Sequence, residues 1–175
     1  IGRVCAELLA GEAGELLLIG KRQDSLDVLK ESLSNSGATA RMITSTKLEE
    51  LRQAKLILTV TSAIEAIIEP RHIQPGSVVC DVARPRDVAA QVAAVRQDVL
   101  VIDGGMVEVP GDVDFHFNFG LPSGKAYACM AETMALTLEG RFEDYTLGKN
   151  IQIERVREIT AIAQKHGFRL SGFRS

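Results

Sequence analysis

The sequence has 175 residues, of which 46% are hydrophobic and 25% charged, and its formal net charge at pH 7 is −3. This composition is typical of a globular domain that can bury its own core, and the negative charge argues against a nucleic-acid-binding face. The apolar runs have the length of strands, so we expect no integral membrane segment.

The cysteines limit the kinds of site that the sequence can contain. Cys5, Cys80 and Cys129 are odd in number and lie far apart, with no CxxC pair among them. This spacing argues against a disulfide framework and against a bound metal, and it predicts a reducing compartment, which we take to be the cytoplasm. The first residue is Ile1 rather than a methionine, so we expect the natural polypeptide to extend before it.

Short apolar runs alternate with helical patterns along the first hundred residues. Strands are predicted at 16–20, 38–43, 56–61, 77–82 and 99–102, and helices at 1–11, 24–33, 46–53 and 87–95. This alternation predicts right-handed βαβ units and a doubly wound parallel sheet, the α/β architecture of a Rossmann-type nucleotide-binding domain.

The rhythm changes after Asp103. Residues 104–122 are predicted to form a long connection, a feature that is usually functional in a compact domain. Two helices follow in the prediction, at 124–138 with Ser123 as N-cap and at 151–166 with Asn150 as N-cap. We therefore expect a Rossmann domain over 1–123 and a C-terminal helical segment over 124–175 that packs on it.

Gly2 stands at the start of the first predicted helix. A Rossmann domain carries the last glycine of its phosphate-binding turn there, although a glycine can also serve close helix packing. The strand that normally precedes this turn is absent from the sequence. Because that strand lies at the centre of the sheet, its neighbours would leave buried backbone groups unpaired, at about 1–3 kcal/mol each. We expect a sheet that lacks its first strand.

The turn after the second strand of such a domain selects the cofactor. An acid there binds the ribose hydroxyls of NAD, whereas basic residues pair with the 2′-phosphate of NADP. This sequence has Lys21 and Arg22 at that point and no acid. The pair predicts NADP(H) as cofactor, with a solvated basic turn as the alternative.

Other candidate cofactor contacts stand at later strand ends. Thr59, Thr61 and Ser62 follow the strand that flanks the cofactor crevice, where small hydroxyl residues either admit a ribose or cap the next turn. Gly104 and Gly105 are predicted to form a corner after the next strand, which either admits a nicotinamide or makes a tight turn.

Cys129 and His116 are the candidate catalytic residues. Cys129 lies on the predicted helix 124–138, where a cysteine on an apolar face is usually buried packing. Lys125, one turn earlier on the same predicted face, would favour its thiolate. His116 lies in an alternating stretch opposite Phe115, Phe117 and Phe119, and could act as an acid or base.

These residues lie in two stretches that resemble a known family. VIDGGMVEVPGDVDF (101–115) and the stretch from AYACMAETMALTLEG (126–140) to QKHGF (164–168) resemble the C-terminal part of the long-chain acyl-[acyl-carrier-protein] reductases, which form aldehydes. The turn with Lys21 and Arg22 is compatible with the use of NADPH by that family, but its sequence is not identical to the turn expected in the family. The family's large N-terminal region, which supplies the acyl tunnel and the carrier-protein surface, has no counterpart here, and some relatives are known only as predicted dehydrogenases.

The resemblance implies a function. Cys129 would take the acyl group of an acyl carrier protein or acyl-CoA as a thioester, and NADPH would reduce it to the aldehyde. The residues alone leave two alternatives: an NADP-dependent dehydrogenase of a small hydroxy, keto or amino acid without a covalent step, and a nucleotide-binding module without turnover. The composition is also compatible with a homo-oligomer.

Overall fold

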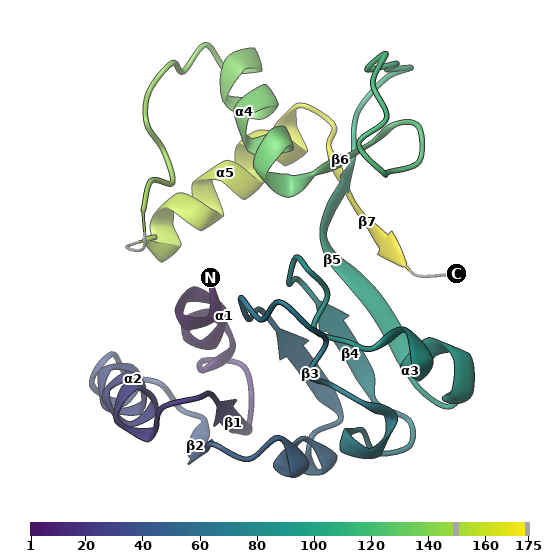
Figure 1. The fold of residues 1–175 in the computed structure, drawn as a ribbon. Coiled ribbons are helices and arrows are strands. Elements are labelled where there is room, and N and C mark those ends of the chain that lie inside the picture. Colours follow the sequence, from purple (N-terminus) through teal and green to yellow (C-terminus); the bar gives the residue numbers. More distant parts are fainter. Residues whose placement is uncertain (149–150, 174–175) are drawn as a thin grey trace. The chain divides into compact units, whose positions relative to one another are not determined.

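The computed structural model describes residues 1–148 and 151–173, and the chain divides into two compact units. The first unit is Ile1–Val101 and the second begins at Ile102. The strand β5 (Leu100–Glu108) passes from the first unit into the second (Figure 1). The division of the units at Val101 lies earlier in the chain than the expected boundary at residue 123.

The first unit alternates strands with helices in the order that the hydrophobic pattern predicts. Its elements are α1 (Gly2–Leu9), β1 (Glu15–Ile19), α2 (Gln23–Asn35), β2 (Arg41–Ser45), η1 (Leu48–Gln53), β3 (Leu56–Thr59), η2 (Pro70–His72), β4 (Val78–Asp81) and α3 (Ala90–Val95). The predicted helix at 46–53 is a 3₁₀ helix, η1, and the residues on either side of it, Lys47 and Ala54, are both extended.

Parallel pairing confirms the predicted Rossmann architecture. Within the described residues, β1 pairs with β2, β3 pairs with β4, and β5 lies next to β4. The β1–β2 pair and the β3–β4 pair belong to separate sheets (Figure 1). The interruption between β1 and β3 is where the expected first strand of a complete doubly wound sheet would lie.

Each piece of the sheet has its own core. The buried residues around β1 and β2 are Ala6, Ala10, Leu18, Leu26 and Leu33. Those around β3 and β4 are Leu51, Ile57, Ile68, Ile73, Val79, Val88, Val92 and Val101. The apolar runs of β1, β3 and β4 therefore act as the sequence predicts, as strands whose side chains pack against helices.

The second unit is antiparallel. β5 pairs with β6 (Lys125–Tyr127) and with β7 (Arg169–Phe173), and the helices α4 (Ala128–Leu138) and α5 (Ile153–Lys165) pack together. Their shared core consists of Val109, Ala126, Ala131, Ala135, Leu136, Tyr145, Ile162 and Phe168. The C-terminal helices thus pack on the strands and on each other.

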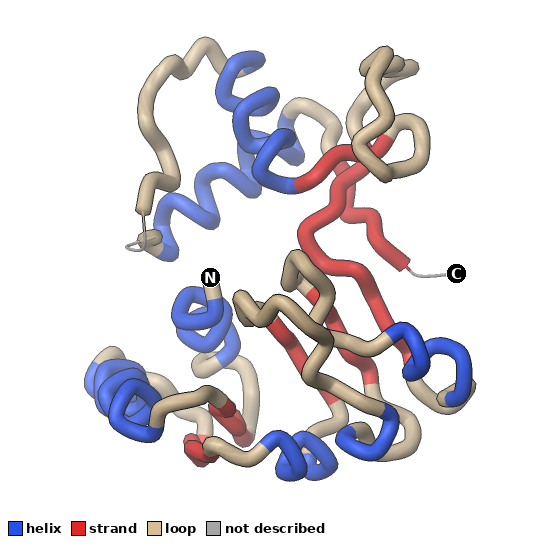
Figure 2. Tube along the Cα trace, in the orientation of Figure 1, coloured by secondary structure: helices blue, strands red, loops and turns tan. Residues whose placement is uncertain are grey.

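The predicted corner at Gly104–Gly105 is wrong, because both glycines lie inside β5. Gly105 has a φ of +73°, and the pairing with β7 shifts register between Ile102 and Met106. A bulge of this kind lets a strand bend without ending. The long connection therefore begins only after Glu108, and Figure 2 shows it as loop from there to β6.

The helix predicted from residue 124 begins later, at Ala128. Residues 125–127 form β6 instead, and the N-cap is Tyr127 rather than Ser123. The last helix begins at Ile153 with Gln152 as its N-cap, while the predicted cap Asn150 lies outside the described residues. β7 was not predicted, because its short sequence carries no clear alternation.

An ionic contact joins the ends of α4 and α5. Lys165 Nζ and His166 Nε2 each lie 2.7 Å from a carboxylate oxygen of Glu139. Two hydrogen bonds hold the pKa of Glu139 below its usual value of 4.5. The bond from Lys165 has the larger effect and the bond from His166 the smaller one. A carboxyl whose pKa is lowered by folding stabilises the folded state when it is ionised.

We predict that the stabilisation by Glu139 is complete above pH 4.5 and is lost as the pH falls through the lowered pKa. Glu139→Gln should therefore unfold at lower urea than the parent at neutral pH, and the difference should vanish in strong acid. Glu31→Gln, at an exposed position on α2, is the control and should unfold like the parent throughout. A difference that persists unchanged in acid would contradict the assignment.

Candidate cofactor and nucleophile sites

Gly2 brings α1 close to the end of β3. A Cβ atom built on Gly2 would lie 3.0 Å from Cγ2 of Val60, which is tighter than nine in ten real Cβ contacts. Its neighbour Ile1 is the N-cap and provides no side-chain hydrogen bond to the helix. The first-turn N–H groups of α1 are therefore available to an anion. This geometry fits the phosphate-binding role that the sequence predicts for Gly2.

The basic pair lies at the carboxyl end of β1, as expected. Lys21 and Arg22 are both exposed, and Gln23 begins α2 directly after them. The side-chain amide of Gln23 donates to Thr44 Oγ1 and to Asp27 Oδ1, each at 2.8 Å. These bonds tie the start of α2 to β2, so the turn that carries the two cations is held at the sheet edge.

Thr59 and Thr61 are held by one buried carboxylate. Both hydroxyls donate to Asp87, and the backbone N–H of Thr61 donates to Asp87 Oδ2 at 2.9 Å. Asp87 is fully buried. The two hydroxyls therefore fix the turn after β3, in agreement with the alternative that they cap this turn. Because both hydroxyls donate to Asp87, a ribose hydroxyl that contacts them must be the donor. Ser62 is exposed beside them.

A second buried carboxylate organises the loop after β4. Asp81 accepts backbone N–H bonds from Ala83 at 3.1 Å and from Val88 at 3.0 Å, and a longer one from Asp87. The loop contains a cis peptide bond before Pro85. Asp81 and Asp87 together join the ends of β3 and β4, the sheet edge at which α/β domains bind ligands.

Sequence reasoning missed Asp87. The signal was present, because an acid two residues after Pro85 and followed by apolar residues suits a buried acceptor in a turn. His72 is a further buried polar residue. It is 4% exposed, and its Nδ1 accepts the backbone N–H of Glu69 within a capping box.

Cys129 is the second residue of α4, and its side chain is exposed. The interpretation as a buried packing residue is therefore wrong, and the thiol is accessible to a substrate. Lys125 does not precede it on the same helical face, because Lys125 lies on β6 opposite Glu108. The other two cysteines are half-buried, and burial raises the pKa of the Cys5 thiol.

His116 lies in a loop rather than in an alternating strand. It has a φ of +51° and a side chain that is 86% exposed, with Nδ1 3.2 Å from Asp114 Oδ2. The aromatic residues around it still gather, since Phe119 lies against Phe115, Phe117 and Tyr127 with ring centroids 5.3–6.4 Å apart. An acid–base role for His116 stays a prediction.

No group of three or more His, Cys, Asp or Glu residues in the described part of the chain could hold a metal ion. None of the helices in that part of the chain combines the length and the apolar character needed to cross a membrane.

The sheet edge, the open start of α1 and the basic turn together describe a dinucleotide site, and the comparison with known families agrees. Residues 1–104, more than half of the chain, match the family model described as shikimate/quinate 5-dehydrogenase. The chain belongs to the shikimate/quinate 5-dehydrogenase family. This membership confirms NADP(H) as the cofactor and an NADP-linked oxidoreductase domain as the coarse function. The cofactor contacts of single residues, including Gly104 and Gly105 in β5, stay predictions.

Two curated relatives connect the chain to larger proteins. A long-chain acyl-[acyl-carrier-protein] reductase of Synechococcus elongatus is 28% identical over 161 residues, which are 89% of this chain and 45% of the relative. Aminotransferase PigE of a Serratia species is 40% identical over 119 residues, 66% of this chain and 14% of the relative. The chain spans less than half the length of either relative. The resemblance to the acyl-carrier-protein reductases is confirmed.

We predict that Asp87→Ala lowers the free energy of unfolding by about 3 kcal/mol, because three donors lose a buried acceptor. Urea unfolding of the two proteins measures the difference. Glu65→Ala, an exposed acid in the preceding loop, should change it by less than about 0.5 kcal/mol. Equal effects of the two substitutions would show that Asp87 does not hold the edge.

Proposed function

We propose that the protein reduces an acyl thioester to an aldehyde with NADPH, through an acyl-enzyme on Cys129. The observation that carries this proposal is the exposed thiol in the first turn of α4. Support comes from the relative whose name states long-chain acyl-[acyl-carrier-protein] reduction. The substrate would be an acyl carrier protein or acyl-CoA thioester.

The first unit would hold the cofactor. The N-terminus of α1 at Gly2 would bind the pyrophosphate, and Lys21 and Arg22 would pair with the 2′-phosphate. The turn fixed by Thr59 and Thr61 would shape the ribose side of the crevice. When bound, NADPH supplies two electrons as a hydride.

The second unit would carry the covalent step. The thiolate of Cys129 attacks the carbonyl carbon of the thioester, a new C–S bond forms, and the carrier leaves as a thiol after taking a proton. Reduction of the resulting acyl-enzyme breaks that C–S bond, releases the aldehyde and returns the Cys129 thiol.

The first turn of α4 suits the charge that develops in these steps. Its backbone N–H groups have no acceptor within the helix, and Tyr127 as N-cap provides no side-chain hydrogen bond. A carbonyl oxygen that becomes negative beside Cys129 would lie near these donors. The helix would thus hold both the nucleophile and the oxyanion.

A second candidate is favoured by the family match, whose description names a shikimate/quinate 5-dehydrogenase. An NADP-dependent dehydrogenase of a small hydroxy, keto or amino acid would need no covalent step. Turnover of such a substrate that is unchanged in Cys129→Ala would favour this reading.

We predict that the full-length protein gains the mass of one acyl group on Cys129 when it is incubated with an acyl-CoA without NADPH. Cys129→Ala should gain none and should lose aldehyde formation by at least about a thousandfold, as expected for a removed nucleophile. Cys5→Ala and Cys80→Ala are matched controls, because their thiols are half-buried, and both should acylate like the parent. Normal turnover in Cys129→Ala would refute the proposal.

We predict that Lys21→Ala combined with Arg22→Ala weakens NADPH binding roughly tenfold or more while NADH binding stays the same, because charge-assisted bonds to the 2′-phosphate are lost. Titration of cofactor fluorescence measures both dissociation constants. Lys30→Ala on α2 is the matched control and should change neither. Equal weakening of NADH and NADPH would show that the pair does not read the 2′-phosphate.

A further inference from the structure

Two acids lie close to the basic turn of the cofactor site. α2 begins directly after Lys21 and Arg22, and it carries Asp24 in its first turn and Asp27 shortly after. All four side chains are exposed. The two carboxylates offset the charge of the two cations, whereas the 2′-phosphate of NADP(H) is an anion. Selection of the phosphate therefore depends on where the carboxylates are held, and not only on the presence of the cations.

Three hydrogen bonds hold the carboxylate of Asp27. Gln23 Nε2 donates to Asp27 Oδ1 and to Thr44 Oγ1, each at 2.8 Å. The Thr44 hydroxyl donates in turn to Asp27 Oδ1 at 3.3 Å. Both hydrogens of the Gln23 amide nitrogen are thereby used. The side chains of Gln23, Thr44 and Asp27 thus form a closed hydrogen-bonded ring.

The ring joins a helix to a strand of the first unit. Gln23 and Asp27 are four residues apart on α2, a spacing at which side chains are neighbours. Thr44 belongs to β2 and is paired with Leu18 of β1, so its place in the sheet is fixed by the parallel pairing. The ring therefore holds the Asp27 carboxylate against β2, at a defined position relative to the end of β1 that carries the basic turn.

The Asp27 side chain would have more than one rotamer open to it at this exposed position if the ring were absent. A carboxylate that turned toward Lys21 and Arg22 would pair with them and would repel a phosphate at the same place. Charges repel across the surface over a Debye length of about 8 Å at physiological ionic strength. The orientation of Asp27 thus matters for an anion bound at the turn.

We propose that Gln23 and Thr44 set the preference for NADPH over NADH by holding the Asp27 carboxylate against β2, away from the 2′-phosphate. The inference rests on the proposed pairing of Lys21 and Arg22 with that phosphate, and it adds Gln23 as a positioning residue. NADH has no 2′-phosphate, so its binding does not depend on the ring. An amide and a hydroxyl therefore contribute to cofactor selection beside the two cations.

Substitution of Gln23 tests the ring. Gln23→Ala in the full-length protein removes two of the three bonds to the ring. It should weaken NADPH binding roughly fivefold, the size of one repulsion between surface charges, and leave NADH binding unchanged. Titration of cofactor fluorescence measures both dissociation constants. Gln53→Ala, at an exposed glutamine at the end of η1, is the matched control and should change neither.

Removal of the carboxylate separates its charge from mere support of α2. In Gln23→Ala combined with Asp27→Ala, NADPH binding should return to within about twofold of the parent, because no carboxylate is left to turn toward the phosphate. Asp27→Ala alone should not weaken NADPH binding. Glu31→Ala, at the next acid along α2, is the control and should leave the defect of Gln23→Ala unrepaired.

The outcomes separate the ring from the proposed cofactor contacts. If Lys21→Ala with Arg22→Ala weakens NADPH binding but Gln23→Ala does not, the ring proposal is overturned and the contacts of the basic pair stand. If Gln23→Ala weakens both cofactors alike, or the added Asp27→Ala restores nothing, the ring only supports the helix and the proposal is again overturned. If neither the basic pair nor Gln23 affects NADPH binding, both proposals fail.

Discussion

Two buried carboxylates hold the carboxyl-terminal edge of the sheet in the first unit. Asp87 accepts hydrogen bonds from the turn after β3, and Asp81 accepts them from the loop after β4. Buried acceptors with several good donors are stable only when all the partners stay in place. The position of Thr59, Thr61 and the neighbouring loops therefore depends on this pair, and with it the shape of the edge to which the cofactor site belongs.

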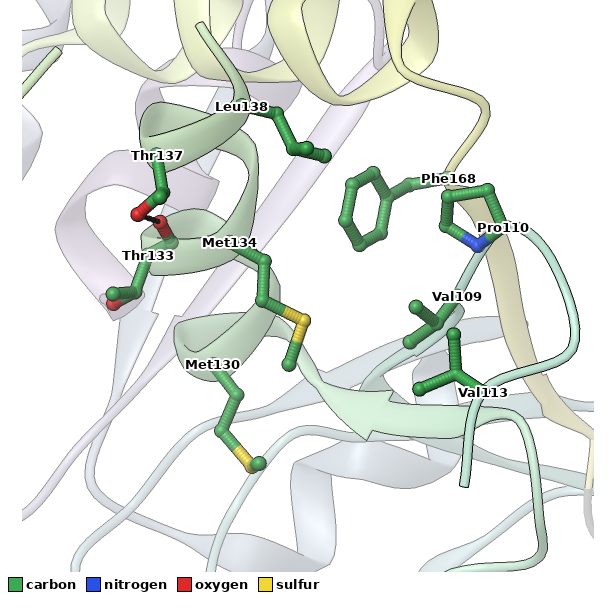
Figure 3. A pocket seen from close by; sticks show the side chains of 9 residues that line it. All are labelled: Val109, Pro110, Val113, Met130, Thr133, Met134, Thr137, Leu138 and Phe168. Carbon is green, nitrogen blue, oxygen red and sulfur yellow. Dashed lines mark hydrogen bonds between the residues drawn. The ribbon is translucent and has the colours of Figure 1, made fainter. Parts of the chain in front are cut away.

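The second unit holds the thiol of Cys129 in an exposed position. Antiparallel pairing of β6 with β5 fixes the start of α4, so that Cys129 lies in the first turn of the helix with its side chain exposed. The opposite face of α4 is anchored in the core by Ala135 and Leu136. Leu138, on another side of the helix, is 57% exposed and lines an apolar pocket of this unit (Figure 3).

The fold of the first unit could be predicted because parallel strands leave a strong signal. Runs such as Leu16–Ile19 and Leu56–Thr59 are rich in apolar side chains, since Leu18 and Ile57 are buried in the cores of the two pieces of the sheet. Gly104 and Gly105 misled the prediction, because a glycine pair indicates a turn as often as a bulge. Only the pairing of β5 with β6 and β7, which is distant in sequence, shows which of the two occurs.

Part of the candidate site could also be predicted, because it lies at the end of a recognisable strand. The position of Lys21 and Arg22 at the carboxyl end of β1 could be found from the strand that precedes them. Asp87 belongs to no recurring hydrophobic pattern that would mark it as buried. The exposure of Cys129 depends on where α4 begins, and the sequence places that start earlier, directly after Ser123.

A single turnover of acylated protein tests the central claim most directly. The full-length protein, acylated on Cys129 and freed of excess thioester, is mixed with NADPH while cofactor oxidation, intact mass and aldehyde are followed together. The account predicts that one NADPH is oxidised and one aldehyde appears for each acyl group lost from Cys129. Loss of the acyl group as free acid without NADPH oxidation, or an acyl group that persists in the presence of NADPH, would contradict it.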